Sequence, residues 1–200
     1  MIRISDYIQE FPDLFQEDSH TVPWKFVSLI QSLIIKKIQS LSSDFEVRGN
    51  IAIHKTAIIE EHAILKGPLI ISHNCFVAAH AYLRNGVYLG NRVSLGPGCE
   101  VKSSCIFSHS SLAHFNFVGD SLIGSGINME AGAVIANHFN ERISKEVEVV
   151  FNGERIKTGI EKFGALVGDG SRIGANAVLS PGTILPPNSI IRRLELVEQF

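Results

Sequence analysis

Residues 87–135 read VYLGNR VSLGPG CEVKSS CIFSHS SLAHFN FVGDSL IGSGIN MEAGAV I, and the division into sixes marks a repeat. Most residues that open these hexads are apolar: Val87, Val93, Cys99, Cys105, Ser111, Phe117, Ile123, Met129 and Ile135. A six-residue period fits neither a helix of 3.6 residues per turn nor the two-residue alternation of a strand. It fits a coil with three sides, in which each hexad supplies one short strand and one turn.

Two further runs carry the same period toward both ends of the chain. They are Ile58, Ile64, Ile70, Phe76 and Tyr82, and later Val167, Ile173, Leu179 and Leu185. Small residues precede each member of the later run by two positions, and we expect them near the corners: Ala165, Ser171, Ala177 and Thr183. Coils of three hexads would stack about 4.8 Å apart. The sequence therefore predicts an all-β solenoid, a left-handed parallel β-helix over residues 47–190. An ordinary β-sandwich with coincidental spacing is the alternative, and nine consecutive positions in phase argue against it.

Residues 1–46 lack this period and predict a helical unit. Thr21 is suited to the N-cap and Pro23 to the first turn of a helix. An apolar stripe at helical spacing follows, consisting of Phe26, Val27, Ile30, Ile34, Ile38 and Leu41. We expect this helix to cap the open end of the solenoid. A helix that binds a partner is the alternative.

The period stops again at Asn137 and resumes near Ala165. Alternating residues around Asn152-Gly153 predict a β-hairpin inside this excursion loop, residues 138–164. Long loops on a rigid scaffold often carry function, although a simple interface arm is equally compatible with the sequence. Residues 191–200 are expected to form a C-terminal tail.

Composition excludes several classes of protein. The 200 residues are 45% hydrophobic and 19% charged with a net charge of −2, so we expect a packed core and no nucleic-acid partner. No apolar segment is long enough to span a bilayer, and no secretory signal is seen at the N-terminus. The three cysteines, Cys75, Cys99 and Cys105, lack metal-ligand spacing and predict reduced thiols in a cytoplasmic protein. We expect Cys99 and Cys105 to point into the core.

Two segments resemble a known family of enzymes. They are AHFNFVGDSLIG (residues 113–124) and INMEAGAVIAN (residues 127–137), and the likeness extends from about Ala81 to Leu185. They are similar to the acetyltransferase domain of the bifunctional sugar-1-phosphate nucleotidyltransferases, which make UDP-N-acetylglucosamine. The resemblance implies a homotrimer that transfers an acetyl group from acetyl-CoA to glucosamine 1-phosphate or a similar amino-sugar phosphate. It implies no metal.

The resemblance also implies roles for single residues. Arg84 and Lys102 fall on phosphate-binding positions, with Glu100 as a supporting carboxylate, and His114 falls on the catalytic base. Asn128 and Asn137 fall on asparagines of the substrate site. Ala165 and Ser180 lie where the family binds acetyl-CoA.

The chain departs from the family pattern in three ways. Phe117 stands where the family usually has tyrosine, so a hydroxyl is missing from the expected substrate site. The lysine that follows the second asparagine in the family has no clean match, although Arg142 and Lys145 are nearby. No Gly-rich, Arg-bearing nucleotide loop precedes the repeats, so we do not expect this chain to make the UDP-sugar.

The spacing of the candidate residues supports an interfacial site. Arg84 and Lys102 are 18 residues apart, which is one coil, so they should stack about 5 Å apart. A phosphate between them would relieve their repulsion; a solvated basic ladder is the alternative. His114 follows Lys102 by two hexads and should lie on another face, so a site that joins all three needs a neighbouring subunit. A histidine there can take the proton from an attacking amine, with Glu100 to orient the imidazole.

Three other functions remain open. His109 and His114 are five residues apart, as in γ-class carbonic anhydrases, but His73 would lie two coils from His109, about 10 Å away, too far to share a zinc ion. The chain could instead be a sugar-phosphate or nucleotide-binding trimer, or a regulatory subunit, without catalysis. Another acceptor or a longer acyl chain, as in lipid A biosynthesis, is the third possibility.

Overall fold

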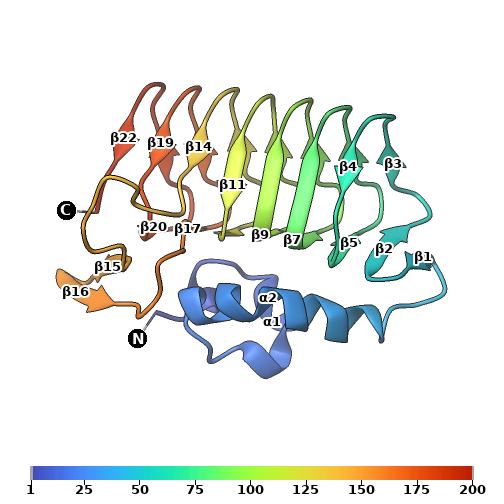
Figure 1. The fold of residues 1–200 in the computed structure, drawn as a ribbon, viewed down its shortest axis with the longest axis horizontal. Helices are drawn as coiled ribbons and strands as arrows, with labels where there is room; N and C mark the ends of the chain where they lie inside the picture. Colours follow the sequence, from blue (N-terminus) through green and yellow to red (C-terminus); the bar gives the residue numbers. More distant parts are fainter. Residues whose placement is uncertain (1, 200) are drawn as a thin grey trace.

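The computed structural model describes residues 2–199 and contains a parallel β-helix with helices along one side (Figure 1). Met1 and Phe200, the outermost residues of the expected N-terminal unit and C-terminal tail, lie outside the described residues. Parallel strands stack one coil at a time, so that Tyr82 pairs with Glu100, 18 residues later. The predicted left-handed parallel β-helix is confirmed.

The coils form a prism with three strand faces. Face 1 contains β2 (Ile51–His54), β5 (Leu69–Ile71), the second halves of β7 (Tyr82–Leu89) and β9 (Glu100–Ile106), β12 (Leu122–Ile123), β17 (Ala165–Val167) and β20 (Thr183–Leu185). Face 2 contains β3 (Ile58–Ile59), β6 (Phe76–Val77), β8 (Ser94–Leu95), β10 (Ser111–Leu112), β13 (Asn128–Met129), β18 (Arg172–Ile173) and β21 (Ile190–Ile191). Face 3 contains β4 (Ile64–Leu65), the first halves of β7 and β9, β11 (Phe117–Gly119), β14 (Val134–Ile135), β19 (Val178–Leu179) and β22 (Leu196–Val197). The strands therefore continue past residue 190, where we expect the tail to begin.

Two short steps change the phase of the repeat. Inward residues are mostly six apart, but the step from Val101 to Ile106 is five residues, and so is the step from Val118 to Ile123. Every sixth residue counted from Val87 is therefore inward as far as Cys99, outward from Cys105 to Phe117, and inward again from Ile123 onward.

Cys105 shows the consequence of this change of phase. It belongs to the apolar cluster between face 1 and the N-terminal helices, whereas Cys99 belongs to the core of the prism. The prediction that Cys105 points into the prism is therefore wrong, and the prediction for Cys99 is confirmed. Ser111 and Phe117 also lie on the outer surface, with exposed and half-buried side chains respectively.

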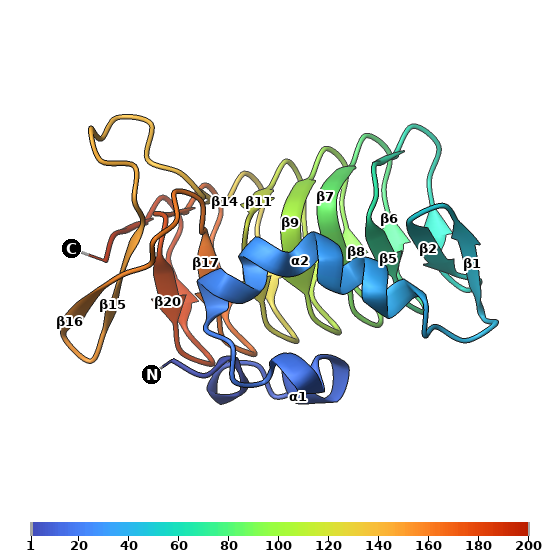
Figure 2. The same ribbon diagram turned by 60° about the horizontal axis from the view of Figure 1, so that its bottom comes forward.

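The N-terminal helices cover the side of the prism and not its end. They are η1 (Ile4–Asp6), α1 (Phe11–Leu14), η2 (Gln16–Asp18) and α2 (Pro23–Ile38). Figure 2 shows α2 lying across the strands of face 1, and α2 contacts β5, β7 and β9. The expected cap over the open end is therefore wrong in position; at that end β1 (Phe45–Arg48) pairs antiparallel with β2. The helix begins one residue later than expected, with Val22 at the N-cap and Pro23 in the first turn.

Apolar outward residues on face 1 explain why the helices lie there. These residues are buried under the N-terminal segment and include Ile70, Tyr88, Cys105, Leu122 and Leu166. The apolar stripe of α2 supplies the opposite side of this second core, with Phe26, Ile30 and Ile34 all at most 2% exposed. Removal of this apolar surface from water stabilises the arrangement. Among residues 2–199, no helix is long and apolar enough to cross a membrane.

Two carboxylates attach the N-terminal segment to one corner of the prism. Glu10 accepts hydrogen bonds from the hydroxyls of Ser108 and Ser125 at 2.7 and 2.9 Å. Asp169 accepts one from the backbone N–H of Gln9 at 2.9 Å and another from that of Ser125 at 2.7 Å. These bonds fix the register of residues 7–10 on the β-helix.

The excursion loop contains the expected hairpin. Strands β15 (Glu148–Phe151) and β16 (Glu154–Lys157) pair antiparallel around Asn152-Gly153, and both turn residues have positive φ, as such a turn requires. The hairpin lies beside β20 (Figure 2). Val147, Val149 and Phe163 are fully buried in the second core, so the base of this arm is fixed to the prism.

Candidate functional site

The edge between faces 3 and 1 carries a column of cations. Arg84 on β7 lies in register with Lys102 on β9, as the 18-residue spacing predicts. Lys66 continues the column one coil earlier, because Leu65 pairs with Leu83. We call Lys66, Arg84 and Lys102 the basic column. Ring contacts link its first two members, since Lys66 and Arg84 both lie near the Tyr82 ring, at 5.1 and 5.6 Å from its centroid.

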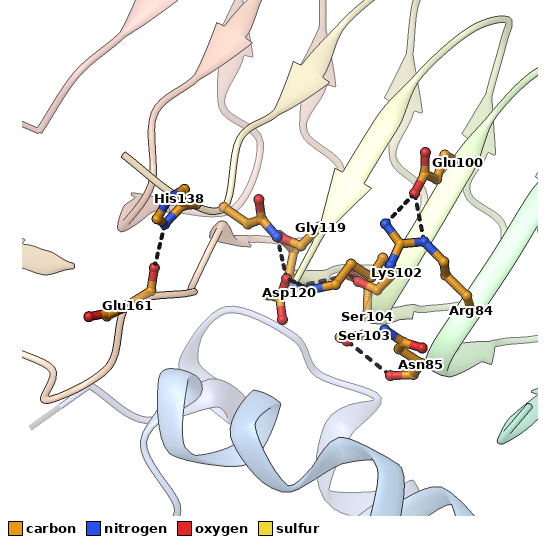
Figure 3. Close-up of polar contacts among 12 residues, drawn as sticks. Arg84, Asn85, Glu100, Lys102, Ser103, Ser104, Gly119, Asp120, His138 and Glu161 are labelled. Atoms are coloured by element: carbon orange, nitrogen blue, oxygen red, sulfur yellow. Dashed lines mark hydrogen bonds and ion pairs between the residues drawn. The ribbon is translucent and has the colours of Figure 1, made fainter. Parts of the chain in front are cut away.

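Two of the three cations already have carboxylate partners. The Arg84 guanidinium donates to Glu100 Oε1 through Nε at 2.8 Å and through Nη2 at 2.7 Å (Figure 3). The Lys102 ammonium donates to the Asp120 carboxylate. The protein therefore supplies counter-charges for both Arg84 and Lys102, and no bound anion is needed to relieve their repulsion. That a phosphate binds between them stays a prediction.

Glu100 consequently has a different partner from the one we expect for it. Its carboxylate accepts from Arg84, and among the described residues no hydrogen bond joins it to His114, which lies at the turn that precedes β11. Within one chain the structure pairs Glu100 with the Arg84 guanidinium; that Glu100 orients the His114 imidazole stays a prediction.

Asp120 joins Lys102 to Asn137. Its carboxylate accepts from Lys102 Nζ (Figure 3) and from Asn137 Nδ2. Asn137 is the last residue before the excursion loop, so this hydrogen-bonded group lies where the arm leaves the prism. A compact set of donors and acceptors with little freedom suits a polar, hydroxyl-bearing ligand.

Phe117 borders the same group. A Cβ added at Gly119 would meet Phe117 Cζ and both Cγ and Nδ2 of Asn137, each at 2.8 Å. Glycine at position 119 therefore allows the ring and the amide to approach the same point of the backbone. Phe117 is also in register with Glu100, which pairs with Tyr82. Tyr82, two coils earlier on the same face, therefore carries the hydroxyl that Phe117 lacks.

His114 lies on the exposed corner between faces 2 and 3. It is followed by Phe115, which is 71% exposed and has φ of +51°, a conformation that bulky residues rarely adopt. The Phe115 ring lies over Gly98 of the preceding coil, where an added Cβ would be 2.5 Å from Cδ1. Among residues 2–199, no side-chain hydrogen bond or ion pair to His114 is found. One chain therefore presents His114 to solvent and does not bring it to the basic column.

Asn128 lies apart from the column, on face 2. With Glu130, Arg172 and Arg193 it lines an open cleft of about 400 Å³. The Arg193 guanidinium binds both oxygens of Glu130 at 2.8 and 3.0 Å, and the Ala175 N–H adds a third bond at 2.9 Å. These contacts lower the pKa of the Glu130 carboxyl to about 2.

The two residues expected to bind acetyl-CoA lie in different surroundings. Ser180 follows β19 at the edge of face 3, in the same column as Arg84 and Lys102. Ala165 points into the prism, is fully buried, and its N–H donates to Ser121 Oγ at 3.0 Å. The side chain and N–H of Ala165 are therefore already engaged within the protein. The assignments of Ala165 and Ser180 to acetyl-CoA binding remain predictions.

The cysteines show no sign of a catalytic thiol. Cys75, Cys99 and Cys105 are free and at most 1% exposed. Burial raises the pKa of the Cys75 thiol to about 11 and also raises the pKa of the other two. All three therefore remain protonated near neutral pH.

Histidines do not gather into a metal site in the part of the chain that the structure describes. No group of three His, Cys, Asp or Glu side chains suited to a metal ion occurs among residues 2–199. His109 lies at the corner between faces 1 and 2, and His114 lies at the corner between faces 2 and 3. The five-residue spacing thus separates these two side chains within one chain.

Sequence reasoning missed three residues of the site. Lys66 precedes Arg84 by 18 residues, Tyr82 precedes Glu100 by 18, and Asp120 follows Lys102 by 18. The interval that predicted the stacking of Arg84 on Lys102 identifies Lys66 and Tyr82 when it is applied one coil earlier. It does not identify Asp120, because the next coil is one residue shorter and Lys102 is in register with Gly119.

The stacked parallel coils and the six-residue spacing of their inward residues define the class of protein: a β-helix protein of the hexapeptide-repeat type. The family described as the GMPPB C-terminal domain matches residues 65–199. The chain belongs to this family.

The chain is also similar in sequence to several bifunctional proteins. The chain is 44% identical over 84 residues to a bifunctional sugar-1-phosphate nucleotidylyltransferase/acetyltransferase of Sulfurisphaera tokodaii, a match that covers 42% of the chain and 20% of the relative. It is 39% identical over 176 residues to the bifunctional protein GlmU of Methanococcus maripaludis strain C7, covering 84% of the chain and 41% of the relative. GlmU of strain S2 is 31% identical over 174 residues, with the same coverage. The chain thus spans 20% to 41% of the length of these relatives.

Proposed function

We propose that the chain is an acetyltransferase that moves the acetyl group of acetyl-CoA to the amine of an amino-sugar phosphate, such as glucosamine 1-phosphate. The observation that carries the proposal is the polar group on face 3. Arg84, Lys102, Asn137 and Phe117 all fall on substrate positions of the family motif, and they lie together in space. The name of the Sulfurisphaera tokodaii relative, which includes an acetyltransferase, supports the same activity.

The chemistry needs one base and no change of oxidation state. The substrate amine attacks the thioester carbonyl, a C–N bond forms, and the C–S bond to CoA breaks. His114 accepts the proton that the amine loses, and that proton can then pass to the departing thiolate. Arg84, Lys102 and Asn137 hold the acceptor through its phosphate and hydroxyls. Because both cations have counter-charges, the phosphate would compete with or share these carboxylate contacts.

A homotrimer would complete this site. His114 and Lys102 lie at opposite edges of face 3 in one chain, so a neighbouring subunit must supply one of them. Face 1 is covered by the N-terminal helices, which leaves faces 2 and 3 for contact between subunits. Both carry exposed apolar side chains, at Ile58 and Ile190 on face 2 and at Ile64 and Leu196 on face 3, each at least 52% exposed. Exposed apolar side chains of this kind favour burial at an interface.

Three reduced, buried cysteines are compatible with a cytoplasmic protein.

Release of free CoA from acetyl-CoA in the presence of glucosamine 1-phosphate tests the proposal. We expect release in the wild-type protein, loss of at least 100-fold in His114→Ala, and no loss in His20→Ala, an exposed histidine remote from face 3. Size-exclusion chromatography with light scattering should give three times the chain mass of 21.9 kDa.

Negative results separate the alternatives. Bound acetyl-CoA without CoA release on glucosamine 1-phosphate would indicate another acceptor. Bound sugar phosphate without acetyl-CoA binding would support the non-catalytic binding trimer, an alternative that the absent hydroxyl at Phe117 favours.

A further inference from the structure

We infer that Asp120 is a positioning residue that holds Lys102 and Asn137 as one acceptor-binding unit at the base of the excursion arm. This inference rests on the proposed function, because it assigns Asp120 a role in binding the acceptor. It adds a residue that the family comparison did not single out. The carboxylate of Asp120 accepts from Lys102 Nζ (Figure 3) and from Asn137 Nδ2, so one side chain fixes both candidate substrate-binding residues.

Burial makes the Lys102–Asp120 contact more than a surface ion pair. The side chains of Lys102 and Asp120 are each 11% exposed, whereas those of Arg84 and Glu100 are 28% and 32% exposed. A lysine ammonium on a flexible stem has no fixed direction of its own. In this site the direction comes from Asp120, because a poorly solvated ammonium needs a counter-charge.

Backbone contacts place Asp120 between the two ends of the arm. Its N–H donates to Lys102 O at 2.8 Å, and its carbonyl accepts from the N–H of Gly164 at 2.9 Å. Asn137 O accepts from the N–H of Phe163 at 3.1 Å, which closes the base of the arm beside the same group. The arm thus leaves at a residue bonded to the Asp120 side chain and returns at a residue bonded to its backbone. A change in the Asp120 carboxylate should therefore first alter the positions of the Lys102 and Asn137 side chains.

Asp169 provides a matched control within the same fold. It is also a carboxylate at a corner of the prism and accepts hydrogen bonds from the N–H groups of Gln9 and Ser125. Gln9 and Ser125 help to anchor the N-terminal segment, and neither is a candidate site residue. Asp120→Asn and Asp169→Asn each replace one charged acceptor by a neutral one of the same shape, but only the first touches the acceptor site.

Steady-state kinetics tests the positioning role. In Asp120→Asn we expect the KM for glucosamine 1-phosphate to rise at least 10-fold while the KM for acetyl-CoA changes less than 2-fold. Asp169→Asn should leave both unchanged. In a double-mutant cycle, Lys102→Met should add little to the loss already caused by Asp120→Asn, because the two residues act as a unit. An equal rise in the KM for glucosamine 1-phosphate and in the KM for acetyl-CoA would overturn the inference. So would additive effects of Asp120→Asn and Lys102→Met on the KM for glucosamine 1-phosphate.

A second measurement does not depend on turnover. The rate at which an amine-reactive acetylating reagent labels Lys102 can be followed by mass spectrometry in each folded variant. We expect labelling of Lys102 to be at least 5-fold faster in Asp120→Asn than in the wild type and unchanged in Asp169→Asn. Equal rates in Asp120→Asn and wild type would show that Asp120 does not hold Lys102, whatever the protein's activity. An inactive wild-type protein with the expected labelling pattern would count against the proposed function and leave the positioning of Lys102 by Asp120 supported.

Discussion

Arg84 and Lys102 lie in register on neighbouring strands, and the carboxylates that neutralise them come from later coils of the same chain. Glu100 follows Arg84 by 16 residues, and Asp120 follows Lys102 by 18. The two cations can therefore stack without repulsion in the absence of a ligand. Neutralisation also limits how strongly this edge attracts anions in general, which favours a ligand that uses hydroxyl and phosphate contacts together.

Removal of the Glu100 charge should strengthen the binding of simple anions. In Glu100→Gln the Arg84 guanidinium loses its counter-charge, and we expect inorganic phosphate to bind roughly 3- to 10-fold more tightly, a modest gain because the pair is about one-third exposed. Calorimetric titration with phosphate at low ionic strength measures the effect. Glu46→Gln is the control, because it frees Arg48 from an exposed pair outside the site. Unchanged affinity in Glu100→Gln would mean that Glu100 does not limit access of anions to Arg84.

Truncation of Phe26 should show how much stability the second core provides. Phe26 is fully buried, with its ring centroid 5.0 Å from those of Phe11 and Phe15. Phe26→Ala should lower the free energy of unfolding by roughly 3–5 kcal/mol, since it removes a buried ring and leaves a cavity. Urea denaturation followed by circular dichroism measures this loss. Leu29→Ala, on the exposed side of α2, should cost under about 1 kcal/mol. A similarly small loss in Phe26→Ala would mean that α2 is not required for the stability of the β-helix.

The repeat in the sequence was enough to predict the type of fold but not the phase of every coil. Period six and small corner residues identify the three-sided prism, because inward positions tolerate only apolar or small side chains. Two coils are one residue shorter, and nothing in the local sequence around Ser104 or Ser121 marks the missing position. In the structure these serines repair the short corners: Ser121 N–H donates to Ser104 Oγ at 3.0 Å, and Ala165 N–H donates to Ser121 Oγ at 3.0 Å. Such side-chain substitutes for backbone bonds become visible only in three dimensions.

The site was predictable only in part, for a related reason. The stacking of Arg84 on Lys102 follows from one interval, whereas the pairing of Glu100 with Arg84 depends on side-chain direction across two strands. The apolar stripe of α2 predicted a buried helix but not its location. Its place depended on outward apolar residues of face 1, such as Tyr88 and Leu122, which the constant count of six did not separate from inward ones.

Glu130 should make stability depend on pH in the acid range. Arg193 and the Ala175 N–H lower the pKa of its carboxyl to about 2, below the value of about 4.3 for an unfolded glutamate. Its stabilising contribution is therefore complete above about pH 4.3 and is lost as the pH falls toward 2. We expect the urea midpoint of Glu130→Gln to lie below that of the wild type at pH 6, with the difference shrinking as the pH falls from 4 to 3. A difference that stays constant over this range would mean that the charge of Glu130 does not contribute.

Gly119 should separate activity from stability. In Gly119→Ala the new Cβ would come within 2.8 Å of Asn137 and Phe117, and both contacts are with side-chain ends that can move. We therefore expect a loss of stability below about 1 kcal/mol, together with a rise of at least 10-fold in the KM for the amino-sugar phosphate, because Asn137 is displaced from Asp120.

Gly126→Ala should behave in the opposite way. Gly126 has φ of +67° and nothing within 4 Å of an added Cβ, so alanine there meets no neighbour but must adopt a left-handed conformation. That conformation should cost roughly 1–2 kcal/mol of stability and leave both KM values unchanged. Urea denaturation and steady-state kinetics on the two variants give the comparison. If Gly119→Ala retains the wild-type KM, the space over Gly119 is not part of the acceptor site, and the placement of Phe117 and Asn137 beside the substrate is wrong.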